Sequence, residues 1–150
     1  MLLRPFCLML VLLLAGCSSA HQQRNSLYAQ LGEQQGITRI VDYFLAELAG
    51  DDDVLPMFAN TNIERFREKL IEQLCFLADG PCEYTGDSMR DVHRGMDISH
   101  AQFNSVVDDL IRAMERQGVA VRAQNALLQR LAALYGEVVR EAEPLLDQHF

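Results

Sequence analysis

This chain has no basic run. It carries 13 lysine and arginine residues against 21 aspartate and glutamate residues, a formal net charge of −8. A nucleic-acid-binding domain needs a concentrated basic surface, so this balance argues against that class. The chain also has no internal repeat, and none of its segments alternates convincingly between apolar and polar residues as a strand does. At 150 residues and 49% apolar content, it is long enough for one domain with a packed core. These features favour a single all-α domain.

The N-terminal apolar run is too short to cross a membrane. Phe6 to Ala15 reaches about 15 Å as a helix, roughly half of a ~30 Å hydrocarbon core. Because the run follows Arg4, it is typical of a signal peptide. It ends in Leu14-Ala15-Gly16-Cys17, which resembles a bacterial lipoprotein cleavage box. Residues 1–16 would then be removed and Cys17 would carry lipid; the alternative is an ordinary signal peptide with an incidental cysteine.

The expected location is the bacterial envelope, lipid-anchored at the outer membrane and facing the periplasm. This follows from Ser18, because a serine rather than an aspartate after the lipidated cysteine resembles the pattern of lipoproteins that are sorted to the outer membrane. The periplasm permits disulfides, and Cys75 and Cys82 are near enough in sequence to pair across a helix end. Geometry decides such a pairing, so the sequence leaves it open.

Spacing and capping signals predict the helices. After a small, polar tether over residues 17–26, the folded domain spans residues 27–143 and a tail spans residues 144–150. Thr61 with Glu64, and Ser99 with Gln102, stand at capping-box spacing. Apolar residues recur at helical intervals, and the expected helices cover residues 27–31, 36–49, 61–78, 88–94, 99–117 and 123–142. The residues expected to face inward are Ile37, Ile40, Val41, Phe44, Leu45 and Leu48 in the second helix, Ile63, Phe66, Leu70, Leu74 and Leu77 in the third, Phe103, Val106, Val107, Leu110, Ile111 and Met114 in the fifth, and Leu127, Leu128, Leu131, Leu134, Tyr135, Val138 and Val139 in the last.

The most informative stretch is Tyr84 to Gly95. Asp87 is a good N-cap for a short helix that ends near His93, and Gly95 then stops it. Met89 and Val92 flank this histidine, which places one imidazole at the edge of an apolar wall. Such an imidazole is a good ligand for iron, zinc or haem. The alternative is a histidine that is simply satisfied within the protein.

The surrounding residues resemble the proximal histidine region of group 1 truncated haemoglobins. The string that carries the resemblance is Tyr84-Thr85-Gly86, Met89, Val92-His93 and Ile98. The similarity extends from about Leu27 to Val139. It implies a truncated globin-like two-over-two helical sandwich that holds haem b, with His93 as the iron ligand. The second imidazole nitrogen should bond a backbone carbonyl. Neither Cys75 nor Cys82 forms a Cys-x-x-Cys-His motif, so the haem would be non-covalent.

The resemblance also implies the walls of the haem site. Lys69 and Arg65 match basic positions that meet the haem propionates; the alternative for both is a solvated helix face. Leu74 is either a wall residue or plain core. The full cofactor-binding set is Phe58, Arg65, Phe66, Lys69, Leu70, Leu74, Thr85, Met89, Val92, Ile98 and Phe103.

The distal side departs from the family pattern. Leu45 stands where the family usually has a tyrosine, and Phe66 and Leu70 occupy the helix that often offers a glutamine. With Phe44, these residues form an apolar distal pocket that offers no hydrogen bond to a bound gas. Gln73, one turn beyond Leu70, is the alternative donor.

The expected function is reversible binding of oxygen or another diatomic gas, NO or CO, at haem iron, without catalysis. One alternative is an NO-detoxifying or peroxidase-like enzyme, which would need an electron-donating partner because the chain has no flavin or nicotinamide motif. Another is a haem-free helical envelope lipoprotein. A zinc site is disfavoured because His93, His100 and His149 are not at ligand spacing.

Overall fold

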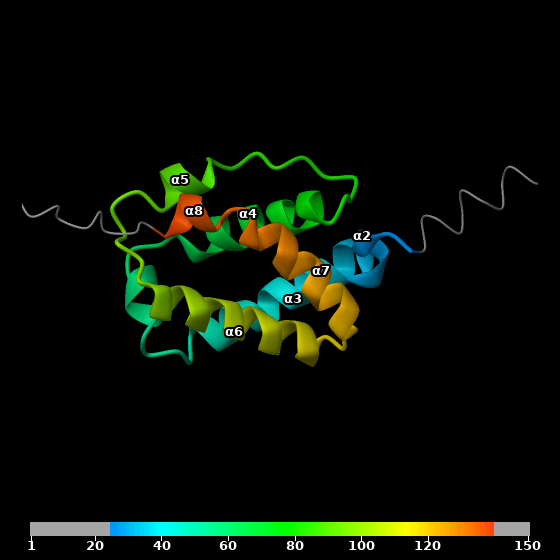
Figure 1. Ribbon diagram of the computed structural model, residues 1–150, viewed down its shortest axis with the longest axis horizontal. Helices are drawn as coiled ribbons and strands as arrows, with labels where there is room; N and C mark the ends of the chain where they lie inside the picture. Colours follow the sequence, from blue (N-terminus) through cyan, green and yellow to red (C-terminus); the bar gives the residue numbers. More distant parts are fainter. Residues whose placement is uncertain (1–24, 140–150) are drawn as a thin grey trace, which may run out of the picture.

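The structure is a computed structural model that describes residues 25–139. This part of the chain contains helices and no strand, which confirms the predicted all-α class (Figure 1). The elements are α2 (Leu27–Gln30), α3 (Glu33–Leu48), the 3-10 helix η1 (Leu55–Phe58), α4 (Ile63–Leu77), α5 (Met89–Val92), α6 (His100–Arg116), α7 (Val121–Ala132) and α8 (Tyr135–Val138). Within residues 25–139 no helix is both long and apolar enough to span a membrane. The predicted signal peptide, Cys17, His149 and the tail from residue 144 lie outside the described residues.

Helix α3 is at the centre of the core. It packs most extensively against α6 and next against α4. Its predicted apolar face is almost fully buried, because helical spacing places these residues on one side. The buried members are Ile37, Ile40, Val41, Phe44 and Leu48, whereas the predicted Leu45 is half-buried.

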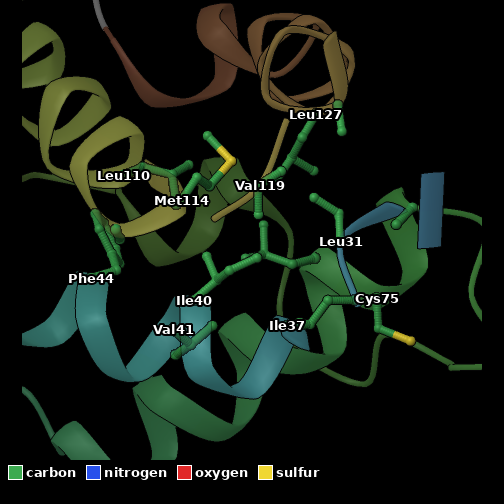
Figure 2. Packing of buried hydrophobic residues seen from close by; sticks show 14 of the residues in the cluster. Leu31, Ile37, Ile40, Val41, Phe44, Cys75, Leu110, Met114, Val119 and Leu127 are labelled. Carbon is green, nitrogen blue, oxygen red and sulfur yellow. The ribbon is translucent and has the colours of Figure 1, made fainter. Parts of the chain in front are cut away.

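Helix α6 completes this part of the core. Leu110 and Met114 from α6 and Leu127 from α7 join the buried face of α3 in one cluster (Figure 2). Ala113 of α6 belongs to the same cluster. Towards its N-terminus the predicted stripe of α6 is less covered, and Phe103 and Val106 are half-buried. The α6 stripe therefore changes from closed core to partly open surface along its length.

The predicted inner face of α4 is more open than that of α3. Leu74 is buried in the core, whereas Phe66, Leu70 and Leu77 are half-buried. Ile63 was predicted to join this face, but it lies in the first turn of α4 and is exposed. Along this face only Leu74 is fully covered.

Helix starts follow the cap chemistry, with three shifts from prediction. The capping box of Ser99 and Gln102 is confirmed. The prediction of Thr61 as cap of α4 is wrong, because Asn62 accepts the hydrogen bond from the Arg65 amide instead. For α5 the cap is Ser88 and not Asp87.

The third shift is at the start of α3, which begins at Glu33 rather than at Gly36. Gly32, with φ of 86°, occupies the N-cap position in a left-handed conformation that suits glycine. Gly36 lies inside the helix and is buried. A Cβ atom there would overlap the Leu31 carbonyl oxygen, so only glycine allows this approach of α2 to α3.

The last helix is broken, whereas the sequence predicts one helix over residues 123–142. Helix α7 ends at Ala132 and α8 begins at Tyr135. Between them the Leu134 amide bonds the Leu131 carbonyl, a spacing of three residues that tightens the turn. The break allows α8 to pack beside α5 (Figure 1). Residues 140–142 of the predicted helix lie outside the described range.

Cys75 and Cys82 form a disulfide, with Cα atoms 5.9 Å apart. The bond joins the last turn of α4 to the segment that leads to α5. Cys75 is itself buried in the core. This tertiary contact resolves the pairing that the sequence left open.

Candidate functional site

His93 is the C-cap residue of α5 and is half-buried. Its Nδ1 lies 2.7 Å from the carbonyl oxygen of Met89. Because a carbonyl only accepts, Nδ1 must be the nitrogen that carries the proton in the neutral ring. Nε2 then presents its lone pair, which is the arrangement found when histidine ligates a metal. The structure thus has the backbone partner that the resemblance implies for an iron-binding imidazole.

Several of the residues predicted as haem walls are half-buried apolar side chains, and they come from different elements. Phe58 of η1 and Phe66 of α4 pack together, with ring centroids 5.2 Å apart. Leu70 and Phe103 are also half-buried. Haem is flat, largely apolar and needs such faces on both sides, so these residues fit it. Incomplete burial of large apolar groups is otherwise unfavourable, by about 25 cal/mol for each Å² left in water.

Other predicted wall residues have different surroundings. Leu74 is only 1% exposed and belongs to the main core, in agreement with the alternative interpretation. Ile98 is buried, Met89 is half-buried and Val92 is exposed beside His93. Arg65 is exposed on α4. Phe58, Phe66 and Leu70 are therefore partly covered residues packed against the core, whereas Leu74 lies within the core.

The predicted distal residues offer no hydrogen-bond donor from their side chains. Phe44 is buried and Leu45 half-buried on α3, next to the partly covered Phe66 and Leu70 of α4. Gln73, the alternative donor, directs its amide towards α5, and its Nε2 lies 3.0 Å from the Met89 sulfur. A thioether is a weak acceptor, so this contact is a weak tie between α4 and α5.

A charged cluster joins α4 to the segment before α5. The Lys69 ammonium donates to Thr85 Oγ1 at 2.7 Å, which brings these two predicted site residues together. It also donates to Glu72 Oε1 at 2.8 Å and to Glu68 Oε1 at 3.2 Å. These carboxylates raise the pKa of Lys69, Glu72 first. Lys69 is therefore a fixed cation rather than a freely solvated one.

Sequence reasoning missed Glu72. Its second oxygen accepts the Thr85 amide at 3.0 Å and the Thr85 hydroxyl at 2.8 Å. The pKa of the Glu72 carboxyl is lowered to about 2, first by Lys69 and then by the two Thr85 donors. Its spacing of three residues from Lys69 was the available signal, since that spacing places both side chains on one helix face.

Tyr135 of α8 contacts two residues of α6, one of which is the predicted wall residue Phe103. Tyr135 makes an edge-on contact with Phe103 at 4.8 Å between ring centroids and hydrogen-bonds Nδ1 of His100. Sequence reasoning predicted that Tyr135 faces inward but assigned it no partner. Within residues 25–139, no three histidine, cysteine, aspartate or glutamate residues form a metal-binding group.

Comparison with known proteins identifies the family. A model of the family described as "Bacterial-like globin" matches residues 26–140. The group 1 truncated hemoglobin GlbN of Nostoc sp. is 28% identical over 117 residues, which cover 78% of this chain and 99% of that protein. GlbN of Mycolicibacterium paratuberculosis is also 28% identical, over 113 residues that cover 75% of this chain and 83% of that protein.

Solved structures agree on the fold. The Fe(III) form of truncated hemoglobin from Tetrahymena pyriformis superposes with a TM-score of 0.74 at 22% identity and covers 77% of this chain and 98% of that chain. A 2/2 hemoglobin from Synechococcus sp. with covalently attached heme gives 0.71 at 18% identity, with 77% and 99% covered. This chain belongs to the bacterial-like globin family, and its fold is the two-over-two helical sandwich of the truncated haemoglobins.

Proposed function

We propose that this globin binds haem b without a covalent link and reversibly binds a diatomic gas, oxygen, NO or CO, at the iron. The observation that carries the proposal is the hydrogen bond from His93 Nδ1 to the Met89 carbonyl. It fixes the tautomer and orients the ring, so that Nε2 would be the nitrogen that holds the iron. Haem would supply the iron that binds the gas, and the residues of the chain would hold and orient the haem.

The chain supplies two kinds of contact to the cofactor. Phe58, Phe66 and Leu70 provide apolar surface for the porphyrin faces. Lys69, at the charged cluster, and the exposed Arg65 provide cations for the two propionates. A cation held by protein acceptors loses less conformational freedom when it binds a carboxylate than a free lysine does.

The distal residues set the choice among gases. Side chains of Leu45, Phe66 and Leu70 cannot donate to a polar ligand, and a hydrogen bond to a partly charged group contributes about 1.5–3 kcal/mol. Without it, oxygen should dissociate about tenfold to a hundredfold faster than from a globin that has such a donor. Carbon monoxide carries less charge when bound and should lose less.

Reconstitution with haem tests the proposal. The purified chain is mixed with hemin, reduced, and examined by visible spectroscopy, beside His93→Ala and His100→Ala. We expect a Soret band in the native protein and in His100→Ala, and its loss or displacement in His93→Ala. A native protein without a Soret band, or a His93→Ala variant with an unchanged band, would contradict it.

We also propose that the mature protein is anchored by lipid at Cys17 and faces the periplasm. The Cys75–Cys82 disulfide supports an oxidising compartment, because such bonds persist there and are rare in the cytosol. Metabolic labelling with a fatty acid, followed by membrane fractionation, tests this. Label should be incorporated by the native chain and not by Cys17→Ser; equal labelling of both would exclude the anchor.

The alternative functions have less support. An NO dioxygenase must hold oxygen long enough for reaction, and the distal side chains give it no donor. A haem-free scaffold would leave the His93 geometry without a purpose. Turnover of NO or peroxide well above that of free hemin would favour the enzymatic alternative.

A further inference from the structure

The segment of residues 78–88 joins the distal helix α4 to the proximal helix α5. It contains no helix, and beyond the backbone hydrogen bonds at the end of α4 it is tied to α4 by side chains at two points. One is the disulfide between Cys75 and Cys82. The other is the pair of hydrogen bonds from Thr85 to Glu72. Only the second point lies near the start of α5.

The Glu72 carboxylate is a well-satisfied anchor. One oxygen accepts from Lys69 and the other accepts from the backbone amide and the hydroxyl of Thr85. Lys69 also donates to the Thr85 hydroxyl, so the three residues form a closed ring of hydrogen bonds. Bonds that involve ionised groups are roughly twice as strong as neutral ones.

Helix α5 depends on what holds its ends. It spans Met89–Val92, a single turn, and a helix this short is not stable by itself in water. It packs beside α8, and the weak Gln73–Met89 contact joins it to α4. At its N-terminal side the chain passes from Thr85 to the cap residue Ser88, and on this path the Tyr84 hydroxyl donates to the Asp87 carbonyl at 2.7 Å.

We propose that Glu72 is a positioning residue for His93: by holding Thr85 against α4, it fixes where α5 begins and therefore where the imidazole stands relative to the distal helix. The effect on iron rests on the proposed haem function. Glu72 itself touches neither iron nor gas in this role. It acts through Thr85 and the segment that leads to α5.

The first test uses the haem-free protein. Amide hydrogen exchange is compared in the native chain, in Glu72→Leu and in Glu68→Gln. Glu68→Gln is the matched control because Glu68 also pairs with Lys69 but makes no contact with Thr85. We expect exchange to be about tenfold faster at Thr85 and across α5 in Glu72→Leu, since charge-assisted bonds are lost. Unchanged exchange in Glu72→Leu would overturn the proposal.

The second test uses the haem-loaded, ferrous protein. Resonance Raman spectroscopy reports the iron–histidine stretching band, and transfer to excess apomyoglobin reports haem loss. In Glu72→Leu we expect a displaced or broadened band and haem loss about three- to tenfold faster. Glu72→Gln should lie between it and the native protein, because its carbonyl oxygen still accepts from Thr85.

Three results would overturn the role of Glu72. The first is an equal effect of Glu68→Gln, which would show that the Glu72 substitution acts only by changing the charge beside Lys69. The second is faster exchange with an unmoved iron–histidine band, which would show that the anchor does not reach His93. The third is native exchange at Thr85 and an unmoved band in a correctly folded Glu72→Ala, which removes both acceptor oxygens and decides the matter if Glu72→Leu does not fold.

Failure of the proposed function looks different. A native chain without a Soret band would refute haem binding, and the exchange comparison would still decide whether Glu72 fixes α5. A native chain with a normal Soret band and no response to Glu72→Leu would refute only the positioning role.

Discussion

The contact of α3 with α6 and the surface between α4 and α5 are built from similar apolar stripes, but their side chains are buried to different extents. In the first, Ile40 of α3 lies in the same cluster as Leu110 and Met114 of α6, and all three are buried (Figure 2). In the second, Phe66 and Leu70 of α4 are half-buried. Helical spacing thus identifies an inward face, but it does not tell whether a helix or a ligand covers that face.

The largest expected effect separates the two regions by stability. In the haem-free protein, Ile40→Ala should lower the free energy of unfolding by about 2–5 kcal/mol, because it leaves a cavity in closed core. Leu70→Ala should cost roughly half as much, since its side chain is already partly in water. Urea unfolding followed by circular dichroism measures both. Equal losses would mean that the α4 surface is ordinary core.

The same pair of variants should reverse order when haem is bound. Leu70→Ala removes proposed contact with the porphyrin and should accelerate haem loss, whereas a core change at Ile40 should affect it less. Transfer of haem to apomyoglobin, under conditions where both variants are folded, provides the measurement. A greater effect of Ile40→Ala would contradict the assignment of Leu70.

Loss of the disulfide should have the next largest effect on stability. The bond closes a loop between residues separated by 7 positions. Cross-linking a loop of this size restricts the unfolded chain and stabilises the folded one by about 2 kcal/mol. The double variant Cys75→Ser/Cys82→Ser should lose that amount in urea unfolding. The native protein treated with a dithiol is the control, and a reduced protein as stable as the oxidised one would contradict this expectation.

A substitution at Leu45 should convert the apolar distal side to a polar one. Leu45→Tyr places a phenolic hydroxyl where the family usually has one, and we expect oxygen to dissociate about tenfold more slowly. Leu45→Phe is the matched control, because it adds the ring without the donor. Stopped-flow measurement of oxygen release compares the three proteins; slowing by both variants alike would indicate a steric effect.

The smallest expected effect concerns a buried carboxyl in the α3–α6 half. Asp109 is fully buried, and one of its oxygens pairs with Arg112 while Oδ2 has no hydrogen-bond partner among the described residues. Burial raises the pKa of Asp109, and Arg112 opposes this. A raised pKa in the folded state means that stability falls as pH rises through that pKa.

The stability of Asp109→Asn relative to the native protein should therefore be greater at pH 7 than at pH 3. We expect the difference in the free energy of unfolding between the variant and the native protein to change by about 1 kcal/mol over this range, the size of one hydrogen bond. Urea unfolding at both pH values checks it, with the exposed Asp108→Asn as control. If the stability of Asp109→Asn relative to the native protein is instead lower at pH 7 than at pH 3, the pairing of Asp109 with Arg112 outweighs its burial.

Much of the fold was predictable because its signals are local. The α3 stripe, the Ser99–Gln102 capping box and the stop after α6 depend on residues within a few positions of each other. The break before Tyr135 was not predictable, because the residues at the break, Ala133 and Leu134, are good helix formers and neither is a proline or a glycine. There the packing of α8 on α5 overrides the helical pattern.

Of the candidate site, the sequence by itself indicated His93 and a nearby carbonyl partner, which the structure identifies as that of Met89, one helical turn earlier. Tertiary structure decided that Cys75 bonds Cys82, that Leu74 lies in the core, and that Glu72 holds Thr85. Those three outcomes depend on where α4 stands against the segment before α5. Such a placement arises only from packing of the whole chain, which local spacing does not encode.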